Sequence, residues 1–125
     1  MDDQSWAREK RRWVRINTRC ACTVARFDEE GNPKDQRPSK TFNLSSEGVG
    51  LETNFLVRPG EILKITMALG DQVVSFRGRV AHVSHSEGQS FQSGISIGDI
   101  GKMDRIALAR FIYYFKPPQS PSEKQ

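Results

Sequence analysis

Two groups of residues have the types and spacing to bind a ligand that carries negative charge. The first is a basic run at the amino end, made of Lys10, Arg11, Arg12 and Arg15. Arginine side chains form paired hydrogen bonds with phosphate oxygens and with the O6/N7 edge of guanine, and they stack on bases. A solvated basic tail would show the same run, so nucleotide binding and a plain charged tail both stay open.

The second group is the segment Asn43-Leu44-Ser45-Ser46-Glu47-Gly48. Asn43 and Ser45 are two residues apart in an expected strand, so their side chains should project from one face, where an amide and a hydroxyl could bind a polar edge. Gly48 would let the backbone bend or approach a ligand closely. An ordinary polar turn uses the same residue types for local hydrogen bonds, so this interpretation also stays open.

The net charge of the chain lies at its amino end. Residues 1–26 hold seven basic and three acidic side chains, which accounts for the whole formal charge of +4. A length of 125 residues fits one compact domain. No apolar segment is long enough for a membrane span, and the first residues do not resemble a secretion signal. We therefore expect a cytoplasmic protein without a membrane partner.

Other chemistries have little support in the sequence. Cys20 and Cys22 should share one strand face at a spacing that disfavours a disulfide, so we expect buried, unreactive thiols. His82 is expected to be partly buried in a strand and His85 to be exposed in a loop, and neither has a nearby nucleophile or carboxylate pattern. We expect no catalysis, no metal and no cofactor.

The elements that must position these residues follow from the periodicity of apolar side chains. Alternation predicts strands over 14–27, 41–45, 49–53, 63–69, 73–83 and 91–97, with a bulge or bend near Gly78. A turn is expected at 28–33, and the polar stretch that follows it to Lys40 is expected to delay the return strand. Helical spacing after Gly98 predicts one amphipathic helix with Asp104 as its amino-terminal cap, ended by Pro117.

This pattern predicts a mostly β fold, a six-stranded antiparallel barrel with a flanking carboxy-terminal helix. We expect a flexible basic arm over residues 1–13, the barrel domain with its closing helix over 14–116, and a disordered tail over 117–125.

Taken together, the two groups resemble the signature of the PilZ domain, a bacterial receptor module for cyclic di-GMP. That signature is an Arg-x-x-x-Arg arm followed by Asp/Asn-x-Ser-x-x-Gly, matched here by Arg11 to Arg15 and by Asn43 to Gly48. The likeness continues through residues 49–53, 59–61, 76–83, 94–95 and the closing helix. The family fold is a six-stranded antiparallel barrel with a flanking helix, which agrees with the strand pattern.

The resemblance implies a role for each matching residue. Arg11 and Arg15 would contact the guanines and phosphates of cyclic di-GMP, Asn43 and Ser45 would face a guanine, and Gly48 would keep the rim clear. Lys10 stands where many members have another arginine, and it can neutralise phosphate but cannot form a planar fork. Arg12 is a further candidate. The resemblance thus implies a receptor whose arm closes over the ligand and relays this change to a protein effector.

Two alternatives stay open. A divergent PilZ adaptor would act through protein contacts only, although such members usually lose the arginines or the Asn-x-Ser motif. A small barrel with a basic arm could also bind single-stranded nucleic acid through exposed aromatic rings. The periodicity assigns Phe42, Phe76, Phe91, Phe111 and Phe115 to the core, so we expect no nucleic-acid partner.

Overall fold

The structure is a computed structural model that describes residues 15–85 and 88–116. The predicted arm over 1–13 and the predicted tail over 117–125 lie outside these residues. Within them the elements are, in chain order, β1 (Arg15–Ile16), β2 (Ala21–Phe27), β3 (Pro33–Ser45), β4 (Gly48–Thr53), β5 (Ile62–Leu69), β6 (Gln72–His85), β7 (Phe91–Ile100) and α2 (Lys102–Tyr114).

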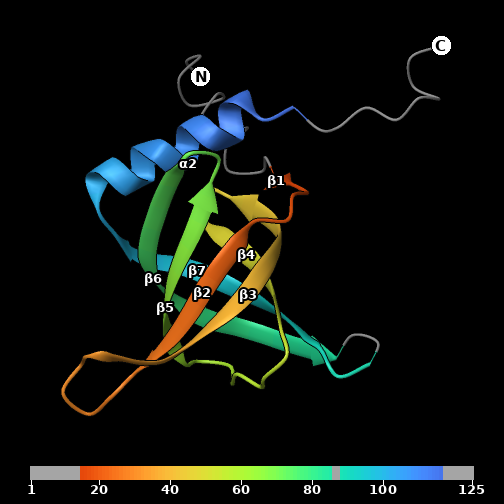
Figure 1. Ribbon diagram of the computed structural model, residues 1–125, viewed down its shortest axis with the longest axis vertical. Coiled ribbons are helices and arrows are strands. Elements are labelled where there is room, and N and C mark those ends of the chain that lie inside the picture. The colour runs from red at the N-terminus through yellow and green to blue at the C-terminus, as the bar shows by residue number, and fades with distance from the viewer. Residues whose placement is uncertain (1–14, 86–87, 117–125) are drawn as a thin grey trace, which may run out of the picture.

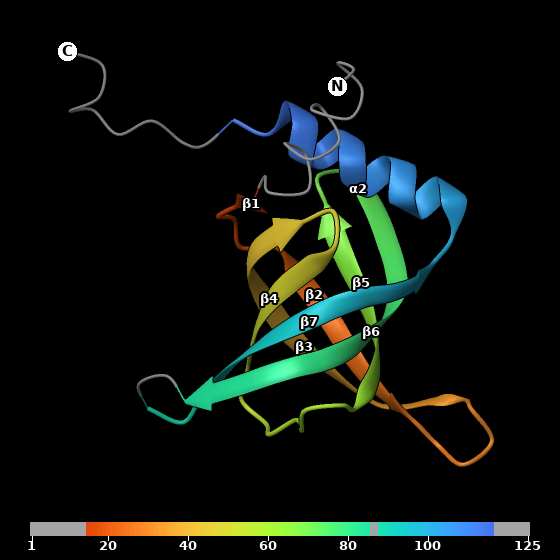
Figure 2. The ribbon, with the colours of Figure 1, turned by 180° about the vertical axis from the view of Figure 1, so that it is seen from behind.

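The strands form one antiparallel sheet that closes on itself. Its order is β1-β3-β2-β5-β6-β7-β4, and the additional pairing of β3 with β4 closes a six-stranded barrel. The short β1 pairs with the far end of β3. Helix α2 lies across one end of the barrel (Figures 1 and 2). The predicted fold class is therefore confirmed.

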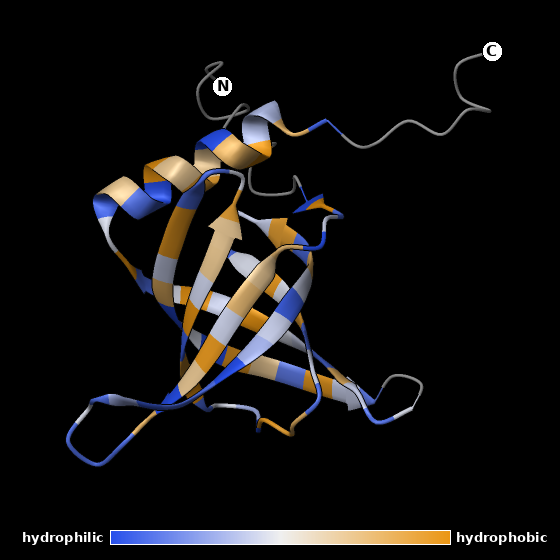
Figure 3. Ribbon diagram, in the orientation of Figure 1, coloured by the Kyte–Doolittle hydropathy of each residue, from blue (hydrophilic) through white to orange (hydrophobic). Residues whose placement is uncertain are grey.

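The interior of the barrel is filled by alternate residues of its strands. In β5 the side chains of Leu63, Ile65 and Met67 are completely buried, as are those of Leu44 in β3 and Leu51 in β4. Apolar and polar positions alternate along the strands in Figure 3, as expected for a sheet with one buried face. Burial of this apolar surface is the main force that holds the barrel together.

The single strand predicted over 14–27 is wrong, because the structure divides it into β1 and β2. The buried Thr41 explains the break: its Oγ1 accepts a hydrogen bond from Cys20 N (2.9 Å) and donates one to Thr18 O (3.0 Å). Thr41 N also donates a backbone hydrogen bond to Cys20 O (3.0 Å), and the register with β3 shifts by one residue between Arg15↔Ser45 and Ala21↔Lys40.

The polar stretch before residue 41 was predicted to lie outside a strand, and this too is wrong. Residues 33–40 form the first half of β3 and pair with β2 along its length. Most of their side chains are exposed, so no apolar alternation marks the segment. The backbone hydrogen bonds to β2 define this part of the strand, and they leave no trace in the hydropathy pattern.

Helix α2 forms where it was predicted but begins differently. Gly101 is its N-cap and makes no side-chain capping bond, so the prediction of Asp104 as the cap is wrong. Asp104 lies in the first turn, where its Oδ2 accepts a hydrogen bond from Ser75 N of β6 (3.2 Å). A carboxylate is favoured there by the helix dipole, and it also fastens the helix to the barrel. Leu108 is buried against the core.

The two cysteines are free and buried, as predicted. Burial and the neighbouring Cys20 thiol raise the pKa of Cys22 to about 12, so its sulfur stays protonated at neutral pH. Among residues 15–85 and 88–116, no cluster of three or more His, Cys, Asp or Glu side chains could hold a metal ion. Within the same residues, no helix has the length and apolar character to cross a membrane.

Candidate functional site

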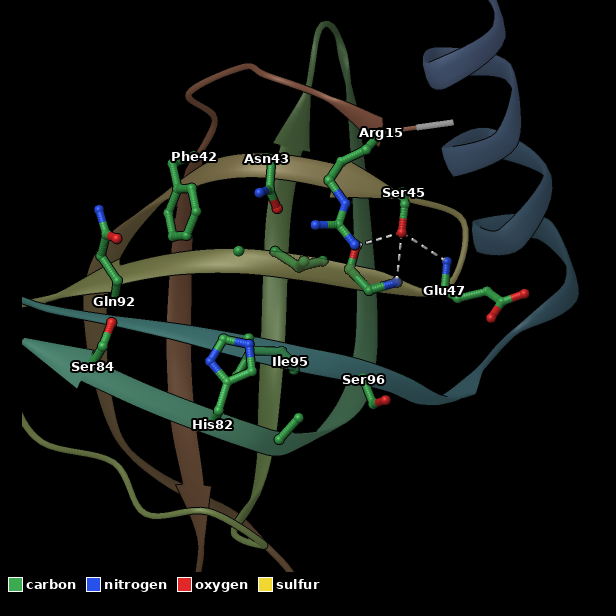
Figure 4. Close-up of a pocket in the computed structure, with 15 residues that line it drawn as sticks. Arg15, Phe42, Asn43, Ser45, Glu47, His82, Ser84, Gln92, Ile95 and Ser96 are labelled. Carbon is green, nitrogen blue, oxygen red and sulfur yellow. Dashed lines mark hydrogen bonds between the residues drawn. The ribbon is translucent and has the colours of Figure 1, made fainter. Parts of the chain in front are cut away.

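A groove on the barrel surface runs across four neighbouring strands, β3, β4, β7 and β6. It has a volume of about 560 Å³, and fifteen residues line it: Arg15, Phe42, Asn43, Ser45, Glu47, Gly48, Val49, Gly50, Ala81, His82, Ser84, Gln92, Gly94, Ile95 and Ser96. Figure 4 shows that Phe42 and Asn43 point from β3, and His82 from β6, toward the two strands between them. The groove is thus a shallow trough with side chains along both rims.

Four of the predicted site residues line this groove: Arg15, Asn43, Ser45 and Gly48. Arg15 is held there because β1 pairs with the end of β3, with Arg15 opposite Ser45. The structure therefore brings Arg15, the last residue of the first motif, together with the second motif, although 28 or more residues separate them in the chain. The other three, Lys10, Arg11 and Arg12, lie outside the described residues.

Ser45 has a local role in the turn between β3 and β4. Its Oγ accepts hydrogen bonds from Glu47 N (3.3 Å) and Gly48 N (3.1 Å) and donates one to Gly48 O (3.3 Å). The interpretation of this segment as a polar turn with local hydrogen bonds is therefore correct for Ser45. A direct contact between Ser45 and a ligand stays a prediction. In the structure, the hydroxyl holds the turn at the rim of the groove through its hydrogen bonds with the backbone of Glu47 and Gly48.

Gly48 is needed for close packing of β4 on β7. A Cβ at this position would lie 3.0 Å from the carbonyl oxygen of Ile95 and 3.9 Å from Ser45 Oγ. The sequence-based prediction was that this glycine keeps the rim clear, so that the backbone can approach a ligand closely. The structure adds that any larger residue here would also press on the neighbouring strand.

One row of residues crosses the floor of the groove. In register across the sheet lie Asn43 of β3, Gly50 of β4, Gly94 of β7 and His82 of β6. At a strand spacing of about 4.8 Å, this row spans about 14 Å. The two central positions have no side chains, which leaves space above their backbone for the side chains at the ends of the row.

The side chains at the two ends of the row lean over the glycines. A Cβ at Gly50 would lie 2.5 Å from Asn43 Oδ1 and 2.7 Å from the ring of Phe42, and a Cβ at Gly94 would overlap the ring of His82. Only glycine leaves the space that these side chains occupy. Phe42, Gly50, His82 and Gly94 are therefore part of the candidate site, although sequence reasoning did not select them.

Two β-bulges explain why Phe42 and His82 were misplaced. The bulge between Thr41 and Asn43 leaves Thr41 inside the barrel and lets Phe42 and Asn43 both line the groove, so the prediction of Phe42 as a core residue is wrong. The bulge between Val80 and His82 likewise exposes His82, which was predicted to be partly buried. A bulge adds one residue to a strand and re-aims the side chains that follow.

The charged groups among the lining residues are few. Arg15 and Glu47 are both exposed, and of the residues that line the groove Arg15 is the one permanent cation. Asn43 and Gln92 add amide groups, which offer both donors and acceptors. The arrangement suits a flat, polar ligand lying over the glycine row, against Phe42, Asn43 and His82, with an anionic group near Arg15.

Comparison with known proteins adds a family and a fold. The chain matches the family model of the PilZ domain over residues 9–114. No protein of curated function matches the sequence significantly. Three of the similar solved structures are relevant. The inhibitor of motility MotI/DgrA of Bacillus subtilis has 14% sequence identity and a TM-score of 0.67, and the match covers 80% of this chain and 48% of that one.

The other two structures come from YcgR of Escherichia coli. YcgR in complex with c-di-GMP has 17% identity and a TM-score of 0.63, with 83% of this chain and 45% of that chain covered. The PilZ domain of YcgR with c-di-GMP has 15% identity and a TM-score of 0.61, and the match covers 83% of this chain and 89% of that one. This chain thus spans about half the length of MotI/DgrA and of YcgR. Since the family model covers most of its length and the fold agrees, the chain belongs to the PilZ domain family.

Proposed function

We propose that this domain is a receptor for cyclic di-GMP, which binds in the groove across β3, β4, β7 and β6, and that it acts as an adaptor toward a protein effector. The observation that carries the proposal is that Arg15, the last residue of the first signature motif, meets the second motif at this groove: Arg15 lies opposite Ser45, and Asn43 and Gly48 line the same groove. The E. coli YcgR structures that share this fold were solved with c-di-GMP, which supports the same ligand class.

The floor of the groove suits the flat bases of such a ligand. Gly50 and Gly94 lie opposite each other, and the side chains of Phe42, Asn43 and His82 lie over them, so a planar ring can rest on these side chains. Phe42 and His82 offer aromatic faces at the two rims, and stacking on aromatic side chains contributes about 1–3 kcal/mol per base. Asn43 Oδ1, directed over Gly50, can accept a hydrogen bond from the edge of a guanine.

The phosphates of the ligand need more positive charge than the described groove supplies. Arg15 can donate a bidentate pair of hydrogen bonds to a phosphate. We assign further contacts to Arg11, Lys10 and Arg12, whose arm would close over the dinucleotide and become ordered as its charge is neutralised. Ordering of the arm would then change the surface that an effector meets.

The proposed role is binding without catalysis, with no metal or cofactor. We also propose a cytoplasmic location. Cys20 and Cys22 support it, because two free buried thiols are typical of a reducing compartment.

Titration calorimetry of the purified protein with cyclic di-GMP tests the proposal, with GTP and a short RNA as competing ligands. We expect cyclic di-GMP alone to bind tightly, and more weakly at higher salt. Arg15→Ala should weaken binding about tenfold or more, because a charge-assisted hydrogen bond contributes about 1.5–3 kcal/mol. Arg58→Ala is the matched control, since Arg58 is exposed and lies outside the groove. Equal affinity of both variants, or preferential binding of the RNA, would refute the site.

A further inference from the structure

The face of α2 that points away from the barrel is rich in apolar side chains. Met103, Ile106, Tyr113 and Tyr114 are 75%, 41%, 75% and 71% exposed. Residues three, four and seven apart lie on one side of a helix, so Met103, Ile106 and Tyr113 form a stripe opposite the buried Leu108. The rings of Tyr113 and Tyr114 touch edge to face at a centroid distance of 4.9 Å. We call these four residues the outer stripe.

The charges around the outer stripe have one sign. Lys102, Arg105 and Arg110 are exposed, and no ion pair within the described residues uses them. The one acidic residue of the helix, Asp104, is turned toward β6, where it accepts the hydrogen bond from Ser75 N. The outward side of α2 therefore combines large apolar side chains with exposed positive charge that no carboxylate of the described residues pairs.

We propose that the outer stripe binds an acidic segment of another protein that carries apolar anchor residues. Exposed Tyr, Met and Arg side chains are the residue types enriched at protein interfaces. The apolar anchors would cover the outer stripe, and the carboxylates would pair with Lys102, Arg105 and Arg110. A helix of 13 residues offers a surface about 20 Å long.

Two other kinds of binding partner fit the basic side chains around the outer stripe less well. A second copy of this chain, packed helix against helix, would bring the same basic side chains together, and like charges across an interface disfavour association. A membrane surface would have to cover the outer stripe with lipid. Arg110 lies within the stripe, four residues after Ile106 and three before Tyr113, so its charge would enter the apolar layer unpaired.

The position of α2 connects this surface to the groove. In both Figures 1 and 2, α2 and β1 lie at the same end of the barrel, and β1 holds the groove residue Arg15. This connection rests on the proposed function: a ligand bound beside Arg15 would lie at the same end of the barrel as α2 and would change its surroundings. The docking surface itself does not depend on the identity of the ligand.

Photo-crosslinking tests the surface on the full chain. A photoreactive benzophenone amino acid is incorporated in place of Tyr113 in the cells that express the protein. In the control protein the same amino acid replaces Arg58, an exposed residue outside α2. We expect position 113, and not position 58, to capture a segment with net negative charge and apolar residues. A crosslink to a second copy, to the chain's own residues 1–14, to lipid, or to no partner would overturn the proposal.

The captured segment is then synthesised as a peptide and titrated against purified variants. Arg110→Glu should weaken binding of this peptide at least tenfold, and Arg58→Glu should leave it unchanged. A second peptide, with lysine in place of the acidic residues, should bind the Arg110→Glu variant more tightly than it binds the wild-type protein. Circular dichroism checks that both variants keep the fold. Equal binding of all variants, or tighter binding to anionic phosphatidylglycerol vesicles than to the peptide, would refute an acidic protein partner.

The same titrations are repeated with saturating cyclic di-GMP, whose own binding is measured on the same samples. If cyclic di-GMP binds and changes peptide affinity at least threefold, both proposals hold. If cyclic di-GMP does not bind but the peptide does, the proposed function fails and the docking surface stands. If cyclic di-GMP binds and the peptide does not, the docking surface fails alone.

Discussion

Replacing Gly94 with alanine places a methyl group in the middle of the groove floor, beside the ring of His82. The added Cβ would lie 2.8 Å from Cε1 and 3.0 Å from Cδ2 of that ring. Carbon atoms in ordinary contact stay about 3.5–4.0 Å apart, so the ring must move by about 1 Å or rotate. Because His82 is exposed, it can swing toward solvent without disturbing the core.

This change should cost much more in binding than in folding. Alanine avoids the entropic cost of a strand glycine, about 0.5–1 kcal/mol, which offsets the cost of turning one exposed side chain. A guanine over the floor would lose part of its stacking on the His82 ring, which contributes about 1–3 kcal/mol per base, and would also meet the methyl group. We expect a total loss of about 1–3 kcal/mol in binding free energy, or about five- to 150-fold in Kd.

Calorimetric titration with cyclic di-GMP and a thermal melt measure the two effects. Gly98→Ala is the control, because it lies in the same strand and its Cβ would make only an ordinary contact, 3.4 Å from Arg77 O. If displacement of the ring causes part of the loss, Gly94→Ala should weaken binding less in a His82→Ala background than in the wild-type protein. A Gly94→Ala variant that binds as tightly as Gly98→Ala would show that no ligand rests on this floor.

Three further predictions concern the elements that support the groove. Ser45→Ala removes the hydroxyl that accepts a hydrogen bond from Gly48 N in the turn between β3 and β4. Binding of cyclic di-GMP should therefore weaken in a titration while the barrel stays folded, and unchanged affinity would contradict this. Thr41→Val leaves Cys20 N without its buried acceptor, which should cost about 1–3 kcal/mol in urea unfolding, and a loss below 0.5 kcal/mol would be too small for that role. The pKa of Cys22 is raised from 9.0 to about 12, so the unfolded chain releases this proton at lower pH than the folded one, and stability should fall as pH rises through that window. Cys22→Ala should flatten this decline in unfolding experiments at pH 8, 9 and 10, and an equally steep decline in the variant would assign it to other groups.

Much of the fold could be predicted because most strands alternate regularly. In β5 every second residue points into the barrel, so Leu63, Ile65 and Met67 identified the strand and its buried face. The first half of β3 was missed because its side chains are exposed and only its hydrogen bonds to β2 make it a strand. Hydropathy reports burial of side chains, and it is silent where backbone pairing alone forms the element.

By itself, the sequence determined the fold class, the family signature and four residues that line the groove: Arg15, Asn43, Ser45 and Gly48. These features depend on local periodicity and short spacing, which a linear chain displays directly. Tertiary structure alone decided the other half of the site. Gly50 and Gly94 form a floor only because β4 pairs with β7 in that register, and Phe42 and His82 reach its rims only because two bulges shift the alternation. Register and bulges depend on which strands become neighbours, and residues far apart in the chain decide this together.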